Sequence, residues 1–224
     1  MGQARLGDGT VLKLVRRGDE RVVEYIILAN GKPLMSSRMH GSEEALATLA
    51  CREARKLARP CVLVGGLGMG FTLRATLDLL PPEAEVVVAE IVRDVVEWNR
   101  GPLAELAGAP LDDPRVRVEV EDVAVTLRGR AERFDAVLLD VDNGPSGFAA
   151  ESNDALYDDR GIAAAFAALK MDGVLAVWSA REDRKFEQRL RHGRFEVEVE
   201  HVRARLKSGG PRHTIFLGRK IARR

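Results

Sequence analysis

Three glycines between a predicted strand and a predicted helix form the segment most directly suited to chemistry. Val62–Val64 is a short apolar run, and glycines follow at positions 66, 68 and 70. Glycine permits tight turns and close approach of a ligand to the backbone, and the helix behind such a loop offers free N–H groups. The dinucleotide fingerprint G-x-G-x-x-G is incomplete because Phe71 takes its last position, and the P-loop motif is absent. We therefore predict that Gly66, Gly68 and Gly70 approach a nucleoside-type ligand.

Two acidic residues follow the next predicted strands at positions that suit such a ligand. Glu90 closes the valine-rich strand Glu85–Ala89 and lies twenty residues beyond Gly70. A carboxylate there can accept hydrogen bonds from ribose hydroxyls, which explains the combination better than an unrelated surface residue does. Asp122 follows the strand Arg115–Val120. It could accept a hydrogen bond from an adenine amino group or cap the next helix, and the two roles stay open.

A third polar group follows the buried strand Phe134–Leu139. Asp140, Asp142 and Asn143 stand at this strand end, and a Gly-Pro turn comes next. Ligand crevices of open α/β sheets lie at the carboxyl ends of the strands, so these side chains would face the same cleft as the glycines. A carboxylate there could act as a base toward a substrate. The alternative is a loop whose polar side chains satisfy only backbone groups.

Two aromatic residues could form a wall of an acceptor pocket. Trp178 ends a predicted strand on the ligand side, and Tyr157 precedes an alanine-rich helix. Packing in the core or at its rim accounts for each of them equally well. The histidines and the two cysteines, Cys51 and Cys61, show no metal-ligand spacing, so we predict no metal.

Composition limits the class of protein. The 224 residues are 46% hydrophobic and 31% charged, as in ordinary globular proteins. Lysines and arginines number 35 against 34 acidic residues, and this balance disfavours a dedicated nucleic-acid binder, although the basic residues of the C-terminal part leave an RNA substrate open. The first ten residues contain no signal-peptide core, and no run approaches the ~18 apolar residues of a membrane span. We predict a cytoplasmic protein with reduced cysteines.

Strands and helices alternate from Cys61 onward, which predicts an α/β fold with a mostly parallel sheet. The segments Phe195–Val202 and His213–Leu217 lack a helix between them and predict an antiparallel hairpin at the sheet edge. A helix is expected from Met69 to Leu80, and the stretch Asp154–Lys170 is expected to contain another, rich in alanine. The fold class is therefore a Rossmann-like sheet over residues 41–224.

Residues 1–40 predict a separate small antiparallel β region. Strands are expected at Thr10–Arg16, Arg21–Ala29 and Lys32–Ser36, with Asn30-Gly31 as the hairpin turn between the last two. Three short strands are marginal alone, so they would pack on the main domain or on a second subunit, giving a homodimer. A helix should follow, capped by Ser42 and stopped by Pro60.

These motifs together resemble the spermidine synthase (aminopropyltransferase) branch of the class I S-adenosylmethionine-dependent methyltransferase superfamily. The resemblance covers roughly residues 61–180. It rests on four segments: Val62–Gly70, Val86–Glu90, the string Leu-Asp-Asp-Pro-Arg-Val at 111–116, and Phe134–Pro145. The small N-terminal β region is also in the place usual for that family.

The resemblance implies a role for each matched position. The three loop glycines would line the nucleoside thioether, Glu90 would bind ribose and Asp122 would bind adenine. Asp140 would assist deprotonation of the attacking amine, with Asp142 beside it and Asn143 at the position of a second family aspartate. The co-substrate would be S-adenosylmethionine or its decarboxylated form, without a metal, and the acceptor a small-molecule amine.

Three departures from the family pattern leave alternatives open. In the family, an aspartate of the glycine loop contacts the aminopropyl group, and here Gly68 replaces it. Asn143 replaces the second strand-end aspartate. The family's tyrosine before the first helix is also replaced here, near Met39-His40. Each change removes an amine-binding group. The alternatives to aminopropyl transfer are therefore methyl transfer to a small molecule or RNA, and a non-catalytic nucleoside-binding relative.

Overall fold

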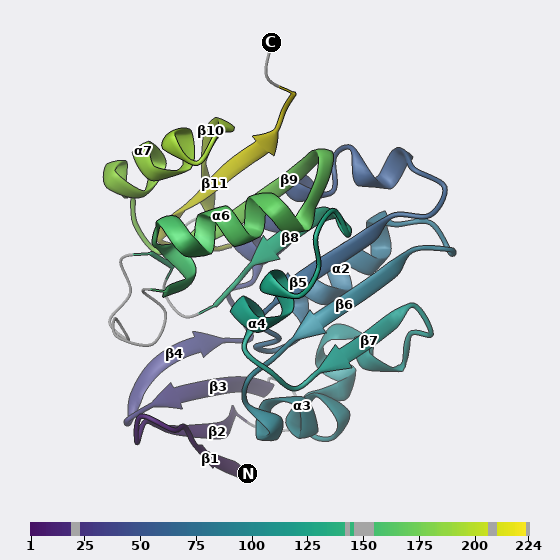
Figure 1. Ribbon diagram of the computed structural model, residues 1–224. Helices are drawn as coiled ribbons and strands as arrows, with labels where there is room; N and C mark the ends of the chain where they lie inside the picture. The colour runs from purple at the N-terminus through teal and green to yellow at the C-terminus, as the bar shows by residue number, and fades with distance from the viewer. Residues whose placement is uncertain (19–22, 142–143, 146–154, 206–209, 223–224) are drawn as a thin grey trace.

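The computed structural model describes residues 1–18, 23–141, 144–145, 155–205 and 210–222, and it contains two sheets (Figure 1). Residues near the N-terminus form a four-stranded sheet in the order β1-β2-β3-β4, and a seven-stranded sheet has the order β10-β11-β9-β8-β5-β6-β7. The strands are β1 (Gly2–Arg5), β2 (Val11–Gly18), β3 (Val23–Ala29), β4 (Lys32–Ser36), β5 (Cys61–Gly65), β6 (Glu85–Ala89), β7 (Val116–Glu119), β8 (Phe134–Leu139), β9 (Leu169–Ser179), β10 (Phe195–Arg203) and β11 (Arg212–Lys220).

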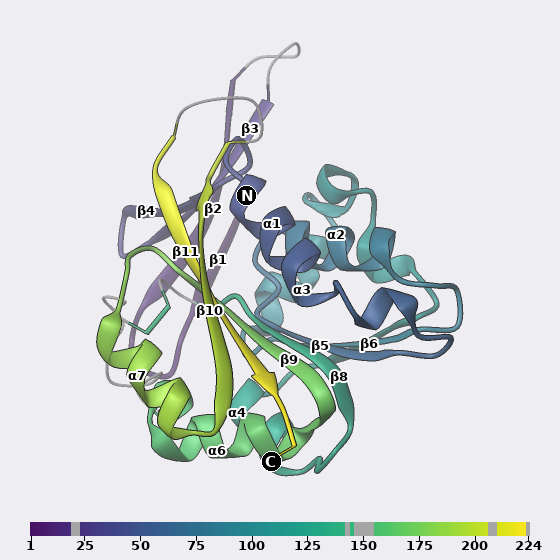
Figure 2. The ribbon, with the colours of Figure 1, turned by 90° about the horizontal axis from the view of Figure 1, so that it is seen from above.

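Helices cover both faces of the seven-stranded sheet (Figure 2). The α-helices are α1 (Gly41–Ala50), α2 (Phe71–Leu79), α3 (Arg93–Arg100), α4 (Val123–Arg128), α6 (Asp159–Ala168) and α7 (Arg184–His192), with 3-10 turns at Ala54–Lys56, Ala104–Ala107 and Pro110–Asp112. The helices α1, α2 and α3 pack on one face, and α4, α6 and α7 pack on the other. The central strands are buried on both faces, which explains their nearly continuous valine and leucine runs.

The strand order confirms the predicted α/β class and places a crevice. Strands β7, β6, β5, β8 and β9 are parallel, and β11 and β10 add an antiparallel hairpin at the edge beside β9. The chain runs outward from β5 through β6 to β7 and then returns to the other side of β5 as β8. The topological switch point therefore lies between β5 and β8, and ligands of such sheets bind at the carboxyl ends of the strands there.

The N-terminal sheet has one strand more than predicted. The additional strand, β1, pairs with β2, and the predicted turn is present because Asn30 and Gly31 both have positive φ, 49° and 79°. Gly2 lies against the indole of Trp98 on α3, where a β-carbon would collide with the ring. This contact joins the start of the chain to the helix that follows β6.

The helix α1 ends earlier in the structure than predicted. It stops at Ala50 and not at Pro60. Ser42 makes no cap, because the first turn has no side-chain cap and the Ser42 hydroxyl bonds to Glu43. The helix α6 lies within the stretch Asp154–Lys170 that was predicted to contain a helix, and β9 begins directly after it, at Leu169.

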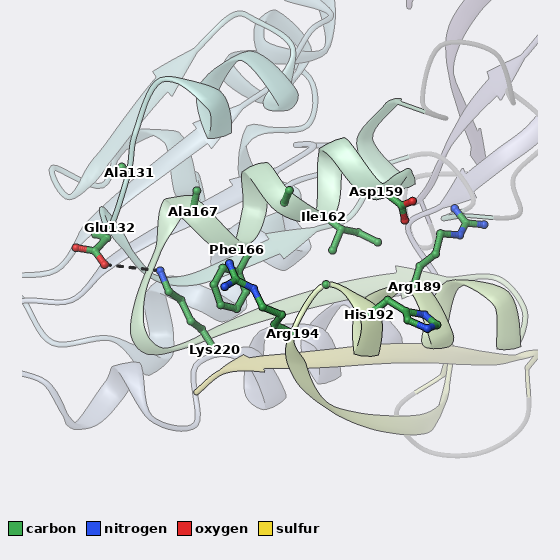
Figure 3. Close-up of a pocket in the computed structure, with 12 residues that line it drawn as sticks. Ala131, Glu132, Asp159, Ile162, Phe166, Ala167, Arg189, His192, Arg194 and Lys220 are labelled. Carbon is green, nitrogen blue, oxygen red and sulfur yellow. Dashed lines mark ion pairs between the residues drawn. The ribbon is translucent and has the colours of Figure 1, made fainter. Parts of the chain in front are cut away.

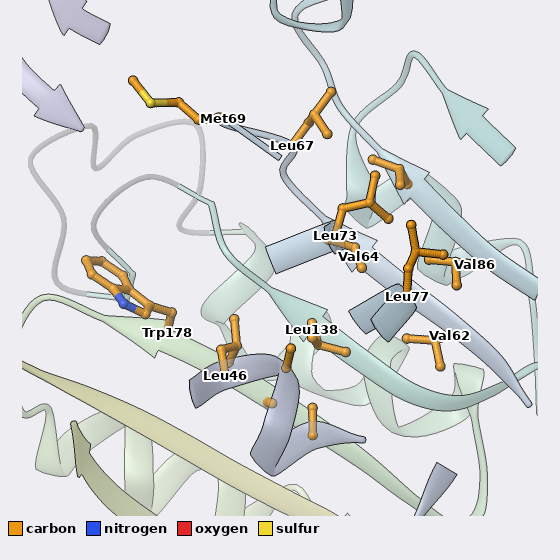
Figure 4. Close-up of a cluster of buried hydrophobic side chains, with 14 of the residues drawn as sticks. Leu46, Val62, Val64, Leu67, Met69, Leu73, Leu77, Val86, Leu138 and Trp178 are labelled. Atoms are coloured by element: carbon orange, nitrogen blue, oxygen red, sulfur yellow. The ribbon is translucent and has the colours of Figure 1, made fainter. Parts of the chain in front are cut away.

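The core between the sheet and its α1–α2 face fixes the strand ends that form the crevice. Figure 4 shows Val62 and Val64 of β5, and Leu138 of β8, facing Leu46 of α1 and Leu73 of α2. All five are at most 1% exposed. Such close packing holds the loops after β5 and β8 in fixed positions relative to each other. No helix among the described residues is long and apolar enough to span a bilayer.

Candidate active site

The glycine loop leaves β5 through three left-handed backbone positions. The φ angles of Gly66, Gly68 and Gly70 are 89°, 52° and 83°. A β-carbon on Gly66 would collide with the backbone carbonyl of Asp140, so the loop passes directly against the end of β8. Asn99 of α3 holds the loop from the other side, because its side-chain amide donates to the Gly68 carbonyl at 2.9 Å. The loop is therefore preorganised between two neighbouring elements.

Glu90 lies at the end of β6, beside the loop, as the sequence predicts. It is 8% exposed. Its Oε2 accepts the Leu67 N–H at 2.9 Å, and its Oε1 accepts the Val92 N–H at 2.8 Å. These bonds tie the glycine loop to the start of α3. A carboxylate offers about four acceptor positions, so the same group has the capacity to accept ribose hydroxyls as well.

Asp122 caps α4. Its Oδ1 accepts the Ala124 N–H at 2.8 Å, and the residue is exposed at the end of β7. This is one of the two roles that the sequence leaves open. The adenine contact stays a prediction, because a capping carboxylate at this strand end can still accept a further hydrogen bond through its second oxygen.

Asp140 continues β8 at the switch point. Its N–H donates to the Gly65 carbonyl at 2.9 Å, and the Thr72 hydroxyl from α2 donates to its Oδ2 at 2.6 Å. Burial raises the pKa of the Asp140 carboxyl, and the Thr72 hydrogen bond opposes that rise. A carboxyl group of raised pKa beside a preorganised loop is suited to exchange a proton with a bound ligand.

Glu43, in the first turn of α1, is a second carboxyl group of this region that the sequence does not single out. Its Oε2 accepts the Ser42 hydroxyl at 2.6 Å. Burial, and next the negative charge of Asp140, raise the pKa of Glu43 to about 7. The two carboxyl groups are thus coupled, so the ionisation of one disfavours the ionisation of the other.

Three further predicted site residues, Asp142, Asn143 and Tyr157, belong to or support the segment after β8. Asp142 and Asn143 lie outside the described residues. Tyr157 is 3% exposed and packs edge-on against Phe186, and its hydroxyl donates to the Val141 carbonyl at 3.4 Å. It therefore supports the start of the loop after β8, and its role as an acceptor wall stays a prediction.

Trp178 lies near the end of β9 and belongs to the cluster shown in Figure 4. It is 9% exposed and meets the ring of His213 edge-on at 4.5 Å between centroids. Its buried Nε1–H has no hydrogen-bond partner among the described residues. A buried donor without a partner is a group that a bound ligand can satisfy.

The N-terminal sheet contributes an apolar group to the loop. A β-carbon on Gly68 would lie 3.3 Å from the sulfur of Met35 on β4. The ring of His40 stacks on Phe71, the first residue of α2, at 4.2 Å between centroids. Gly68 therefore faces a thioether from the N-terminal sheet.

A cavity of about 730 Å³ lies elsewhere, between α6, α7 and the end of β11 (Figure 3). Arg194 and Lys220 both lie over the ring of Phe166, at 4.5 and 4.9 Å, and Lys220 also pairs with Glu132 at 3.8 Å. Arg194 and Lys220 of this cavity thus already have partners. None of the residues that line the cavity belongs to the glycine loop. Nowhere in the described part of the chain do three or more His, Cys, Asp or Glu side chains gather as metal ligands.

The sequence of this chain is similar to that of known aminopropyltransferases. Residues 39–193 match the family model of the spermine/spermidine synthase domain. A polyamine aminopropyltransferase 2 of Pseudomonas aeruginosa is 32% identical over 53% of this chain, and a polyamine aminopropyltransferase of Korarchaeum cryptofilum is 32% identical over 36%. These alignments span only 33% and 24% of the relatives' own lengths.

Solved structures agree in fold. Spermidine synthase from Thermotoga maritima superposes with a TM-score of 0.73 over 98% of this chain and 72% of that one, at 19% identity. A spermidine synthase in complex with the transition-state analogue AdoDATO gives 0.71 over the same shares. Because the family model spans most of the chain and includes the glycine loop, Glu90 and Asp140, the chain belongs to the spermine/spermidine synthase family.

Proposed function

We propose that this protein transfers the aminopropyl group of decarboxylated S-adenosylmethionine to a polyamine-type amine. The observation that carries the proposal is the position of Asp140, whose backbone carbonyl lies against Gly66 of the glycine loop and whose carboxyl group has a pKa raised by burial. The family supports this choice of reaction. The acceptor amine would be a small molecule, and no metal takes part in the proposal.

Each predicted residue then has a part in binding. Gly66, Gly68 and Gly70 would admit the nucleoside thioether against the backbone, with Glu90 on the ribose and Asp122 on the adenine. Asp142 and Asn143, next to Asp140 in sequence, would hold the cationic remainder of the acceptor. Tyr157 and Trp178 would border the acceptor, and the unpartnered Nε1–H of Trp178 supports this assignment.

The chemistry is a displacement at carbon. A neutral amine nitrogen attacks the carbon next to the sulfonium, the carbon–sulfur bond breaks, and its electron pair stays on sulfur as a neutral thioether. The amine enters as an ammonium ion, so one proton must leave before the attack. Asp140 would accept this proton, and its raised pKa makes the carboxylate a stronger base than an ordinary aspartate. The rigid loop would supply the alignment of nitrogen, carbon and sulfur.

A second candidate function rests on Gly68. This position carries no carboxylate, and its neighbour is the Met35 thioether. Position 68 itself therefore supplies no ion-pair partner to the ammonium of an aminopropyl group. The observation favours intact S-adenosylmethionine and methyl transfer as the alternative.

Calorimetric binding of the two co-substrates side by side separates the proposals. They differ by one carboxylate. We expect tighter binding of the decarboxylated form, followed by aminopropyl transfer to a diamine. Tighter binding of intact S-adenosylmethionine would favour methyl transfer, and binding without turnover of either would indicate a non-catalytic relative.

The variant Asp140→Asn tests the base. It keeps the size of the side chain and an acceptor for the Thr72 hydroxyl, but it cannot take a proton. We expect kcat to fall by about 10²-fold or more while the Kd of the co-substrate changes little. Full activity of this variant would disprove the assignment of Asp140.

Two properties of the whole protein stay predictions. One is homodimer formation through the N-terminal sheet, which sedimentation would detect as a doubled mass. The other is location in the cytoplasm.

A further inference from the structure

The N-terminal sheet meets the glycine loop at Met35, a partly buried residue of β4. A β-carbon on Gly68 would lie 3.3 Å from the Met35 sulfur and 3.4 Å from its terminal methyl carbon. Among the described residues, no other atom beyond the chain neighbours of Gly68 comes within 4 Å of that position. The open side of Gly68 therefore faces a thioether and no charged group.

Both sides of this contact are held in place. The Gly68 carbonyl accepts the side-chain amide of Asn99 at 2.9 Å, and Asn99 is buried in the helix α3. Met35 is paired in register with Ile27 of β3, which is 1% exposed. The Met35 side chain therefore stands beside the loop before any ligand binds.

We propose that Met35 selects the decarboxylated co-substrate, because it leaves the carboxylate of intact S-adenosylmethionine without a hydrogen-bond donor beside Gly68. The inference rests on the proposed aminopropyl transfer, which places the sulfur of the co-substrate against the loop glycines. Met35 determines specificity in it and takes no part in the proton transfer or the displacement.

The two co-substrates differ in a single group. Both carry the adenosyl group, the methyl group and a three-carbon arm with an ammonium group on the same sulfonium sulfur. Intact S-adenosylmethionine has in addition a carboxylate on the carbon that bears the ammonium. Which of the two binds more tightly therefore depends on what receives this carboxylate.

A thioether is a poor neighbour for a carboxylate. Methionine has no hydrogen-bond donor, and its sulfur is only a weak acceptor. A carboxylate that leaves water for such a place loses its hydration without a compensating hydrogen bond, which costs free energy. An ammonium group, in contrast, can donate to the sulfur. The contact between Met35 and Gly68 thus weighs against methyl transfer, although position 68 itself lacks a carboxylate.

Two acidic residues beside the loop act in the same direction. The Glu90 carboxylate accepts the Leu67 N–H at 2.9 Å, and Asp140 follows β8, where its own N–H donates to the Gly65 carbonyl at 2.9 Å. The carboxylate of intact S-adenosylmethionine would bring a further negative charge toward them, and like charges disfavour each other. The ammonium group that both co-substrates share gains from the same surroundings.

Calorimetry of Met35→Lys tests the selection. The measured quantity is the Kd of intact S-adenosylmethionine divided by the Kd of the decarboxylated form, since this ratio cancels the contributions of their common parts. We expect a ratio of about ten or more in the unchanged protein and at least a tenfold lower ratio in Met35→Lys, because a lysine donates charged hydrogen bonds to the carboxylate. An equal ratio in both proteins, or tighter binding of the intact form by the unchanged protein, would overturn the inference.

Three controls isolate the contact. Met35→Leu keeps an apolar side chain without donors and should keep the ratio of the unchanged protein. Met171→Lys adds the same charge at a residue of β9 that is 51% exposed, and it should also keep the ratio. The thioether product 5′-methylthioadenosine lacks the arm, so its Kd should not change in Met35→Lys. A ratio that falls in Met171→Lys as it does in Met35→Lys would contradict the role of the contact.

Met35→Gln keeps the test decisive if lysine disturbs the sheet, which weaker binding of 5′-methylthioadenosine would reveal. Glutamine has nearly the length of methionine, and its amide N–H groups can donate to a carboxylate without adding a charge. We expect the ratio to fall by about threefold in this variant. An unchanged ratio, in a Met35→Gln protein that binds 5′-methylthioadenosine normally, would overturn the inference.

Turnover separates this inference from the proposed function. Aminopropyl transfer to a diamine by the unchanged protein tests the proposed function alone. Such transfer, together with an unaltered ratio in Met35→Lys, would overturn the role of Met35 and leave the function in place. A ratio that falls as expected, in a protein that transfers no aminopropyl group, would overturn the proposed function and leave the selection by Met35 in place.

Discussion

Gly66 is a residue at which only a hydrogen atom fits. Its φ is 89°, and a β-carbon would collide with the Asp140 carbonyl. We expect Gly66→Ala to lower the free energy of unfolding by about 1–3 kcal/mol and to weaken co-substrate binding at least tenfold, because the loop must move away from β8. Urea unfolding and calorimetry measure both.

The matched control is Gly129→Ala. Gly129 has a φ of −82°, and the nearest neighbour of its β-carbon would be 3.8 Å away. This variant should unfold and bind like the unchanged protein. Equal behaviour of the two alanine variants would show that the loop tolerates a side chain.

The sequence predicted the site residues that follow strands and missed those that act from helices. Gly66, Glu90 and Asp140 stand at the carboxyl ends of recognisable strands, so topology alone placed them together. Asn99 was missed because its bond to Gly68 joins two elements that are separate in the sequence. Glu43 was missed because Asp140, whose charge raises its pKa, lies far away in the chain.

Arg115 joins two elements beside the sheet. Its guanidinium forms two bonds to the Asp113 carboxylate, at 2.9 and 2.7 Å, and donates to the Leu80 carbonyl at the end of α2. The Arg115 hydrogen bonds lower the pKa of Asp113 to about 2. The string at 111–116 thus has a structural role, which its resemblance to the family does not reveal.

We expect Arg115→Met to lower the free energy of unfolding by about 1–3 kcal/mol at neutral pH, since a charged hydrogen-bond pair is lost. Because the folded-state pKa of Asp113 is lowered, the stabilisation is present above pH 3.8 and is lost as pH falls toward 2. The difference from the unchanged protein should therefore shrink over that interval in urea unfolding. The control is Arg117→Met, whose side chain is 67% exposed. A loss that does not depend on pH would contradict the pairing with Asp113.

The sequence predicted whether a segment forms a helix or a strand where its apolar pattern was long. It did not predict where each helix or strand ends. The valine run of β6 and the strand Phe134–Leu139 were both predicted within their observed bounds. The strand β1 was missed because four residues show too little alternation. The helix α1 was predicted too long because basic residues after Ala50 resemble the favourable end of a helix, whereas the chain there forms a 3-10 turn.

The two sheets are joined at Gly2, whose position against Trp98 leaves no room for a side chain. We expect Gly2→Ala to lower the free energy of unfolding by about 1 kcal/mol and to shift tryptophan fluorescence, because β1 must leave the indole. Co-substrate binding should weaken too, since Asn99 beside Trp98 holds the glycine loop. Gly7→Ala is the control, as nothing lies within 4 Å of its β-carbon. Identical spectra and stability for both variants would show that this contact does not join the sheets.

The division of the chain at residue 40 stays a prediction.

The strand order also sets when the protein can fold during synthesis. β11 lies between β9 and β10, so two strands made earlier pair with a strand made later. Until residues 212–220 have left the ribosome, β9 has an open edge and β10 has no partner in the sheet. His213 arrives with that strand, so the nascent chain forms its edge-on contact with Trp178 only in the step that closes the sheet. A ribosome stalled before residue 212 would therefore hold a protease-sensitive chain that is exposed to chaperones.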